Sequence, residues 1–495
     1  MLWTLLPAAF PAVSQNNWRL IWSDEFNGPA GSPPDPARWT YDLGNNGGWG
    51  NQELETYTNS LTNAYQDGHG NLVIHVQSSS SGFTSARIKT QGMLAAQYGR
   101  IEARIKVPYG QGMWSAFWML GQDITSVGWP QCGEIDVMEN IGKEPSSIHG
   151  TVHGPGYSGG GGITGAYTLK NGEAFSSQFH TFAVQWSPDG IVFFVDGISY
   201  KTVTPASIPA GRQWVFDHPF FLLLNVAVGG TWPGSPDAKT SFPQNMLVDY
   251  VRAFQATADP APVIGGVVDV ASYGNSLAPG GLAAVFGTDL ALLGTSASLF
   301  DEATGTFPVS FAGTTVFVNG ASSPLIYVAP NQINFQVPWE SLVGRPLHVE
   351  VMKNNVLGSA TAITLSTSAP SVFSVNGTAV LTCTGSVPRA GSSCSLWGNG
   401  FGPTQPSQLD GVPASATTPA PTVKPCSLEV GSVDATVQYC GGAPGSLIYQ
   451  LAFVYPSGVR ANSGTTQAAV TVNGFTGNFL MPAPRVFQRR FPLAQ

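Results

Sequence analysis

The sequence predicts an all-β protein built from packed antiparallel sheets. Glycine and proline together supply 97 of the 495 residues (59 and 38), so turns are frequent. Several stretches alternate apolar and polar residues, which is the period of a half-buried strand. No convincing helical pattern runs longer than two turns. Frequent turns, strands of period two and scarce helices together favour sandwiches of antiparallel sheets.

The stretch at residues 99–107 is the clearest strand. Ile101, Ala103 and Ile105 share one face with Val107, and charged residues occupy the other face, so we expect the strand to be half-buried. Turn sequences at Ser187–Gly190 and Asp196–Gly197 indicate hairpins. Further strands are predicted at residues 71–76, 182–186, 191–195 and 246–254.

Composition excludes several classes of protein. Only 10% of residues are charged, which disfavours coiled coils and long charged helices, and a hydrophobic content of 43% disfavours disorder. With 21 basic against 29 acidic residues, the chain lacks the basic face of a nucleic-acid binder. No run of 18 or more apolar residues occurs, so no membrane span is expected.

The chemistry-bearing residues are concentrated in the N-terminal half. Residues 1–260 hold 11 of the 13 Trp, 6 of the 7 His and 20 of the 29 acidic residues. Residues 1–14 have the apolar stretch and small residues of a possible signal peptide, without a positive start. We therefore expect a secreted, extracellular or periplasmic protein. The expected organisation is a main domain at 15–256, a linker at 257–262, β modules at 263–370 and 371–486, and a tail at 487–495.

The segment Gly133–Asn140 carries the most informative motif. Glu134 and Asp136 are two residues apart and share a face of a strand, whereas Glu139 would point the opposite way in a regular strand. A β-bulge at Val137–Met138 would return Glu139 to the same side. Three carboxylates so close would raise at least one pKa, as an acid/base pair requires. The alternative is a strand whose acids face solvent.

Two tryptophans precede this segment at even spacing. Trp114 and Trp118 share one face, with Phe117 and Met119 on the other. One face can then be core and the other a flat aromatic platform, on which the C–H face of a sugar ring stacks. The alternative is that both indoles are core residues.

Residues from about 20 to 255 resemble glycoside hydrolase family 16, in particular its bacterial endo-β-1,3-glucanases (laminarinases). The similarity lies in seven stretches in the family's order: WSDEFNG (22–28), WGNQELETYT (49–58), YGRIEARIKVP (98–108), MWSAFWMLG (113–121), GEIDVMEN (133–140), GTVHGPGYSG (150–159) and VDYVRAFQ (248–255). The resemblance implies a curved jelly-roll sandwich with an open cleft, and a retaining mechanism through a covalent glycosyl-enzyme.

The resemblance also implies roles for individual residues. Glu134 would be the nucleophile, Glu139 the general acid/base, and Asp136 an assisting group. Retention requires the nucleophile and acid/base carboxyls to lie about 5–5.5 Å apart. Substrate-binding residues would be Asn51, Arg100, Trp114, Trp118, Trp129, His153 and Trp232. For Arg100 the alternative is an ion pair with a surface acid.

No cofactor is expected for catalysis, but many members of the family bind a structural Ca²⁺ away from the cleft. Calcium takes oxygen ligands. The candidates by position are Glu25, the backbone carbonyl of Gly70, and Asp249. Asp249 lies in an otherwise apolar strand, where a hydrogen-bonded or salt-bridged acid is the alternative.

The C-terminal half contains a diverged internal repeat. Gln332–Pro338 matches Gln450–Pro456, and Gly280–Leu290 matches Gly391–Phe401, which suggests two immunoglobulin-sized sandwiches. Part of the first copy, residues 327–340, resembles a C-terminal module of secreted Acidobacteria proteins. Of the three possible pairings, Cys383–Cys394 with Cys426–Cys440 is the simplest. We expect a spacer or cell-surface role rather than glucan binding.

From these observations we expect a secreted monomer that hydrolyses β-1,3-glucan from within the chain. One alternative is another substrate of the same family: mixed-linkage β-1,3-1,4-glucan, agar or carrageenan. A second alternative is a non-catalytic β-glucan-binding protein, but such relatives have typically lost the catalytic acids, and all three are present here.

Overall fold

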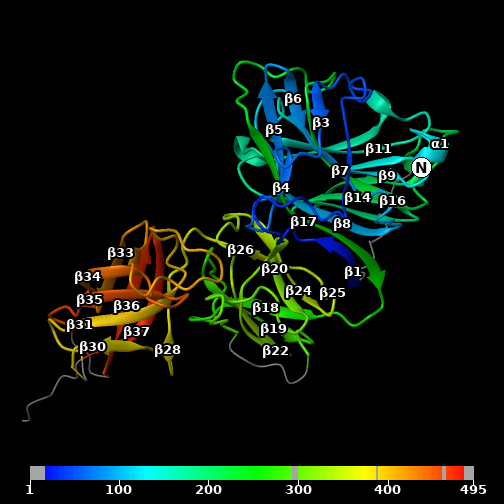
Figure 1. The fold of residues 1–495 in the computed structure, drawn as a ribbon. Helices are drawn as coiled ribbons and strands as arrows, with labels where there is room; N and C mark the ends of the chain where they lie inside the picture. Colours follow the sequence, from blue (N-terminus) through cyan, green and yellow to red (C-terminus); the bar gives the residue numbers. More distant parts are fainter. Residues whose placement is uncertain (1–16, 293–298, 386–387, 460–463, 484–495) are drawn as a thin grey trace, which may run out of the picture.

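The computed structural model describes residues 17–292, 299–385, 388–459 and 464–483, which form three β-sandwich units (Figure 1). The expected signal segment and C-terminal tail lie outside the described residues. The helices in the described ranges are single turns: α1 (Ile124–Val127), η1 (Gly159–Gly161), η2 (Lys170–Gly172) and η3 (Pro205–Ser207). No helix among the described residues has the length and apolar character needed to cross a membrane.

The N-terminal unit is a sandwich of two sheets. The inner sheet has seven strands in the order β12-β11-β10-β9-β16-β7-β2. Their bounds are β2 (Thr40–Asp42), β7 (Arg87–Lys89), β9 (Met113–Gly121), β10 (Glu134–Ile141), β11 (Ser147–His153), β12 (Ile163–Thr168) and β16 (Phe220–Val228).

The outer sheet of this unit follows the order β15-β14-β13-β8-β17-β1, and β5 pairs with β17. Its strands, with the short strands beside β5, are β1 (Asn17–Asp24), β3 (Glu55–Tyr57), β4 (Ala64–Gln66), β5 (Leu72–Ser79), β6 (Gly82–Ser85), β8 (Gly99–Lys106), β13 (His180–Ser187), β14 (Gly190–Val195), β15 (Ile198–Val203) and β17 (Gln244–Thr257). Strands are therefore confirmed in all the stretches that the alternating pattern predicted.

One apolar core fills the space between the two sheets. Ile101 and Ile105 of β8 are fully buried in it, and Phe117 and Met119 of β9 meet them from the inner sheet. The alternation predicted for both strands is therefore confirmed, because the apolar face of each strand points into this core.

The opposite face of β8 differs from the expectation. Glu102 and Arg104 were expected on the open face of a half-buried strand, but they are only 6% and 7% exposed. The first C-terminal module lies against this face and removes it from water. β8 is consequently buried on both sides.

The outer sheet continues into that module. Trp18 and Arg19 of β1 pair with Leu357 and Val356 of β25, so the sheet runs on through β25-β24-β20-β21. The strands added are β20 (Thr314–Val318), β21 (Ala321–Ser322), β24 (Pro346–Lys353), β25 (Val356–Leu357) and β26 (Thr361–Thr364). A paired β1 leaves no open edge at this end of the N-terminal unit.

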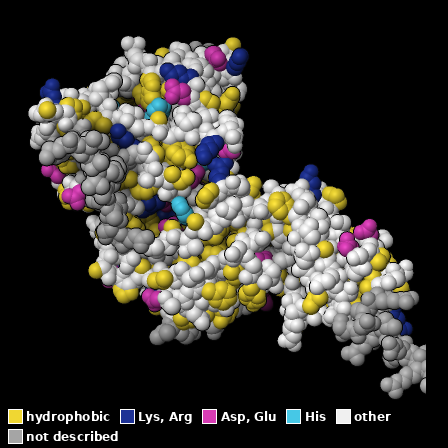
Figure 2. All heavy atoms as spheres, turned by 180° about the vertical axis from the view of Figure 1, so that it is seen from behind, with side chains coloured by type: hydrophobic (Ala, Val, Ile, Leu, Met, Phe, Trp, Pro, Cys, Tyr) yellow, Lys and Arg dark blue, Asp and Glu magenta, His cyan; other side chains and the backbone are white. Residues whose placement is uncertain are grey.

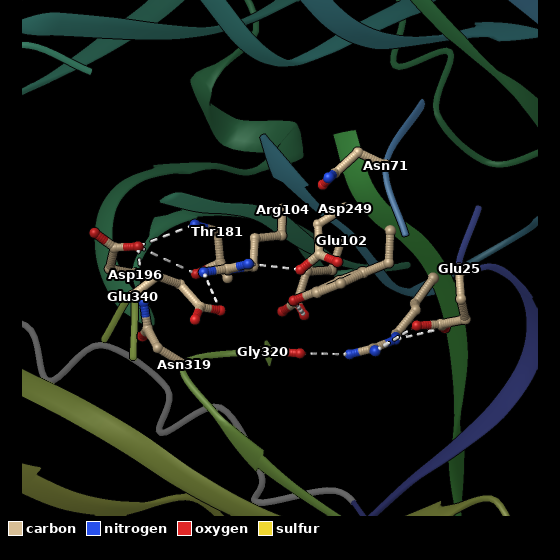
Figure 3. A network of polar contacts seen from close by, with 12 residues as sticks. Glu25, Asn71, Glu102, Arg104, Thr181, Asp196, Asp249, Asn319, Gly320 and Glu340 are labelled. Carbon is tan, nitrogen blue, oxygen red and sulfur yellow. Dashed lines mark hydrogen bonds and ion pairs between the residues drawn. The ribbon is translucent and has the colours of Figure 1, made fainter. Parts of the chain in front are cut away.

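A polar network crosses the same contact (Figure 3). The guanidinium of Arg252 donates to both carboxylate oxygens of Glu25, at 2.9 and 2.7 Å, and to the carbonyl of Gly320 at 3.0 Å. Beside it, Arg104 lies between Asp249 and Glu340 of the module. Arg252 also lies over the ring of Phe317, 4.3 Å from its centroid.

A hairpin turn supplies a second crossing point. Asp196 and Gly197 have φ values of 49° and 74°, as a two-residue turn with left-handed residues requires. The Asp196 carboxylate accepts hydrogen bonds from the Thr181 amide at 2.9 Å and from the Asn319 side chain of the module at 3.1 Å. The turn predicted from Asp-Gly is therefore also part of the contact between units.

The two C-terminal modules are β-sandwiches with separate apolar clusters. The remaining strands of the first module are β18 (Val263–Asp269), β19 (Leu282–Thr288), β22 (Leu325–Ala329) and β23 (Gln332–Gln336). The second module contains β27 (Ser371–Val372), β28 (Ser374–Val375), β29 (Thr378–Ala379), β30 (Leu381–Cys383), β31 (Ser393–Asn399), β32 (Ala420–Pro421), β33 (Cys426–Val430), β34 (Val433–Gly442), β35 (Tyr449–Val454), β36 (Thr465–Val472) and β37 (Phe475–Pro482).

The internal repeat is confirmed by strand register. In the first module β19 pairs with β23, and Leu282 lies opposite Gln336. In the second module β31 pairs with β35, and Ser393 lies opposite Val454. These are the positions that the sequence match equates, so both copies use the same pair of strands in the same register.

The cysteines lie as the spacing suggested. Disulfides join Cys383 to Cys394 and Cys426 to Cys440, both within the second module. Cys132 is a free, buried thiol next to β10. Both disulfides are of the kind that persists in an oxidising compartment.

Arg252→Ala tests how much the N-terminal unit depends on the contact with the first module. The change leaves the Glu25 carboxylate and the Gly320 carbonyl without their partner, so it should lower the free energy of unfolding by about 3 kcal/mol. Urea unfolding of the full-length chain, followed by tryptophan fluorescence, measures this.

The matched control is Arg38→Ala, which removes the exposed ion pair between Arg38 and Asp35. This pair should contribute at most about 1 kcal/mol. Equal losses in the two variants would contradict a stabilising role for the network.

Candidate active site

The bulge expected in β10 is present. Asp136 lies opposite Trp118 of β9, and the next paired residue is Met138, opposite Phe117, so Val137 is the extra residue. Ile135, Val137 and Met138 are all buried in the core. Glu134, Asp136 and Glu139 consequently emerge together on the opposite face, as the motif predicted.

Two indoles hold the outer carboxylates of this group. The Nε1–H of Trp114 donates to Oε1 of Glu139 at 3.1 Å. The Nε1–H of Trp129, a residue that is 48% exposed, donates to Oε2 of Glu134 at 2.8 Å. Both tryptophans were expected to bind substrate. Here each also orients a carboxylate, which restricts where a reacting atom can approach.

His153 lies directly across from the motif. It pairs with Glu134 between β10 and β11, and its Nε2 is 3.1 Å from Oδ2 of Asp136 and 3.8 Å from Oε1 of Glu134. One donor atom from each of these three residues lies within 4.8 Å of the others, a grouping that could also hold a metal ion. However, the indole N–H of Trp129 donates to Glu134, and this hydrogen bond favours a carboxylate that is not bound to a metal ion.

The environment raises the pKa of all three carboxyls. Burial, followed by the charge of Asp136, raises the pKa of Glu134 to about 8. Burial raises the pKa of Glu139 to about 7. Burial and the charge of Glu139 raise the pKa of Asp136 well above its usual range. The group therefore retains protons at neutral pH, as general acid catalysis requires.

A chain of hydrogen bonds supports the second indole of the platform. Trp118 donates to Asn225 at 2.8 Å, Asn225 donates to the hydroxyl of Tyr57 at 3.0 Å, and that hydroxyl donates to Glu53 at 3.3 Å. Asn51 donates to the same carboxylate at 3.0 Å. Asn51 and Trp118 therefore belong to one connected set of hydrogen bonds.

Trp232 stands beside Trp114. The two rings meet edge to face with centroids 5.5 Å apart, and His149 meets Trp232 from another side at 5.1 Å. Lys143 donates to the backbone carbonyl of Trp232 at 2.6 Å. Trp232 therefore lies against the indole that binds Glu139, and its role in substrate binding stays a prediction.

Sequence reasoning missed Arg87 on β7. Its guanidinium lies 4.6 Å from the ring centroid of Trp118 and 4.7 Å from that of Trp49, and its Nε lies 2.9 Å from the carboxylate of Asp42. It therefore lies within cation–π distance of two partly exposed indoles, Trp118 of β9 and Trp49 of the turn before β3. The short alternation Arg87-Ile88-Lys89 was the available signal, because it places both cations on one face.

The assignment of Arg100 to substrate binding was wrong. Arg100 lies on β8 in the outer sheet, on the far side of the core from β10. It is ion-paired with Glu102, and the charge of Glu350 in the first module acts on it as well. The alternative, an ion pair with an acid, is the one observed, although the pair is buried rather than at the surface.

The carboxylates expected to bind calcium already have cationic partners. Glu25 accepts two hydrogen bonds from Arg252, and Asp249 accepts one from Arg104 at 2.6 Å. Each of these carboxylates already lies beside a positively charged guanidinium, which would repel a calcium ion. The set of Glu25, Gly70 and Asp249 therefore fits Ca²⁺ poorly in this arrangement. The calcium site stays a prediction, and no catalytic step depends on it.

The N-terminal half matches known proteins. Residues 50–252 match the family model described as glycosyl hydrolases family 16. A beta-glucanase of Rhodothermus marinus is 40% identical over 249 residues, which cover 48% of this chain and 86% of that protein. Glucan endo-1,3-beta-glucosidase A1 of Niallia circulans is 38% identical over 269 residues, which cover 50% of this chain and 39% of that protein.

Solved structures are similar over the same half, and one of them serves as an example. It is an endo-beta-1,3-glucanase from Pyrococcus furiosus, with 49% identity and a TM-score of 0.47, covering 50% of this chain and 98% of that one. The resemblance of the C-terminal half to an Acidobacteria module stays a prediction. The match to most of the Rhodothermus protein, together with the family model, shows that this chain is a hydrolase that belongs to glycosyl hydrolases family 16.

Proposed function

We propose that this protein is a secreted, endo-acting hydrolase of β-1,3-glucan that retains anomeric configuration. One observation carries the proposal: the bulge at Val137 brings Glu134, Asp136 and Glu139 to one face of β10, between partly exposed indoles. Relatives named beta-glucanase and glucan endo-1,3-beta-glucosidase support the substrate class. The two disulfides support an extracellular or periplasmic location.

In the first step Glu134 attacks the anomeric carbon while Glu139 protonates the leaving glycosidic oxygen. The bond from Glu134 to the sugar forms as the glycosidic bond breaks, and the proton leaves Glu139 with the departing chain. A raised pKa keeps Glu139 protonated for this task. The indole of Trp114 holds its carboxyl in one orientation.

Asp136 allows Glu134 to be charged when it attacks. The pKa of Asp136 is raised well above its usual range, so this carboxyl takes up a proton readily. When Asp136 holds that proton, its charge no longer contributes to the raised pKa of Glu134, and Glu134 can ionise. The hydrogen bond from Trp129 favours the charged form of Glu134 as well.

In the second step Glu139, now a carboxylate, takes a proton from water. The hydroxyl attacks the anomeric carbon, the bond to Glu134 breaks, and the product leaves with its original configuration. Both carboxyls return to their starting protonation states. The required separation of about 5–5.5 Å is within reach of two residues on the same face of one bulged strand.

Replacing either catalytic carboxyl tests the two roles. Glu134→Gln should abolish hydrolysis of all substrates, because no nucleophile remains. Glu139→Gln should lower kcat on laminarin by roughly 10²–10⁴-fold. The same variant should release nitrophenol rapidly in the first turnover of a nitrophenyl β-glycoside of a laminari-oligosaccharide, because that leaving group needs no proton. Later turnovers should be slow, because the second step still lacks its base.

Reducing-sugar release and nitrophenol release measure these rates, and circular dichroism checks that the variants are folded. Proton NMR should show the β-anomer as the first product. Full activity on laminarin in either variant, or an α-anomer first, would sink the proposal. Lichenan, agarose and carrageenan in the same assay distinguish the other specificities of the family.

The pH profile should depend on Glu139. Because the pKa of Glu139 is raised to about 7, the group is protonated below that pH and loses its proton above it, so kcat/KM should fall as pH rises through about 7. Trp114→Phe removes a hydrogen bond that lowers this pKa, so the alkaline limb should move to higher pH. An unmoved limb would contradict the role of the indole.

Arg87 and Arg100 form a matched pair of variants. Arg87→Ala removes the cation between two indoles, and kcat/KM on laminarin should fall about tenfold, mainly through KM. Arg100→Ala breaks a buried ion pair on the outer sheet, so it should lower the unfolding midpoint and leave KM unchanged. Steady-state kinetics and thermal unfolding separate the two outcomes, and a raised KM in Arg100→Ala would reverse the assignment.

A further inference from the structure

A groove of about 410 Å³ lies between the two C-terminal modules. The first module contributes the turn at residues 271–276, and the second contributes residues 475–479 at the start of β37. The connecting segment at 366–377 lines it between them. Only Ala, Ser, Thr, Asn, Gly, Pro, Val, Tyr and Phe are found among the described residues that line it, so none carries a charge. Figure 2 shows how sparse charged side chains are on one whole face of the molecule.

Two aromatic rings of this groove are open to solvent. Tyr273 is 67% exposed and Phe475 is 39% exposed. Tyr273 is the more unusual, because it has a φ of 56° and projects from a tight turn. The Asp269 carboxylate caps this turn by accepting hydrogen bonds from the amides of Ala271 and Ser272, at 3.0 and 2.7 Å. The ring is therefore presented from a fixed backbone.

A buried hydroxyl in the groove has no partner. The side-chain oxygen of Ser371 forms no hydrogen bond with any described residue, although the residue is only 8% exposed. A buried hydroxyl without a partner is unfavourable, and rotation of the Ser371 side chain toward the groove would let a ligand hydroxyl remove this cost. Ser272, Ser374 and Asn478 add further residues with hydroxyl and amide side chains to the lining of the groove.

The two walls are held in place relative to each other. Asn399 of the second module exchanges hydrogen bonds with the backbone of Leu282 in the first, at 2.8 and 2.7 Å, and also donates to Asp269. On the other side, Asn473 donates to Thr367 at 3.0 Å. A preformed groove binds a chain with less loss of conformational entropy than a flexible one.

We propose that this groove is a second binding site for a neutral β-glucan chain, separate from the catalytic carboxylates. The inference rests on the proposed function for the identity of the polymer. Exposed rings offer flat faces to the C–H faces of glucose units, and the neutral polar side chains match sugar hydroxyls. An uncharged lining offers nothing to a sulfated polysaccharide or a nucleic acid. The site would hold the enzyme on insoluble substrate.

The test compares retention on substrate with catalysis. Retention is measured as the loss of protein from solution after mixing with insoluble β-1,3-glucan. The full-length chain carries Glu134→Gln, so the polymer is not degraded. Adding Tyr273→Ala or Phe475→Ala should weaken retention about tenfold. The matched control is Phe300→Ala, which removes a 42% exposed ring outside the groove and should change nothing.

The same substitutions in the active enzyme show whether the catalytic site is affected. Hydrolysis of a short, soluble laminari-oligosaccharide should be unchanged, whereas hydrolysis of the insoluble glucan should slow. Retention equal to that of the parent in both groove variants would overturn the proposal, as would no retention in the parent itself. A failure to hydrolyse the soluble substrate would count against the proposed function, and depletion would still test the groove.

Ser371→Ala separates ligand binding from a structural role. Because the hydroxyl has no partner in the free protein, its removal should leave the unfolding midpoint unchanged or slightly higher. Retention on the glucan should fall by about threefold, which corresponds to the loss of one hydrogen bond. A lower unfolding midpoint with unchanged retention would show that the hydroxyl serves the fold, against the proposal.

Discussion

In a strand of strict period two, Glu134 and Glu139 would lie on opposite faces, and one of them would enter the apolar core. Val137 removes this conflict, because it is the extra residue opposite β9. Val137 and Met138 are both buried, so two neighbouring side chains enter the core and Glu139 returns to the side of Asp136. Burial of the three carboxyls on this face, and then the charges of their neighbours, raise their pKa values. The indole hydrogen bonds of Trp114 and Trp129 also depend on it.

The parts of the fold that depend on local pattern could be predicted from the sequence. The strands, the turn at Asp196–Gly197, the repeat and the bulge in β10 are all confirmed, because each leaves a signature within a few residues or in a repeated segment. The Trp129–Glu134 hydrogen bond was not foreseen, since it depends on how the loop before β10 folds back over the strand.

The two arginines show where sequence alone was insufficient. Arg100 was assigned to substrate binding from the family resemblance, and the alternation of its strand could not correct this, because alternation does not say which of two sheets a strand joins or what covers its polar face. Arg87 lies on a strand of three residues, too short for a strong pattern, and its register opposite Asp42 is set by β2, far away in the chain. Sheet membership is a long-range property, so the residues of the site that depend on it could be assigned only from the structure.

The first C-terminal module is more than a spacer, because it shares a sheet and an apolar cluster with the N-terminal unit. Its strand β25 pairs with β1, and Phe317 and Leu357 form an apolar cluster with Phe254 of the N-terminal unit. The C-terminal half has few charges, yet Glu340 and Glu350 both act on arginines of β8 across this contact. The side chains of Arg100 and Arg104 are largely buried, at 13% and 9% exposed, and such charges are tolerable only while their acidic partners stay in place. A module that merely set a distance would leave these arginines in water, so their burial indicates a unit that remains docked on the outer sheet.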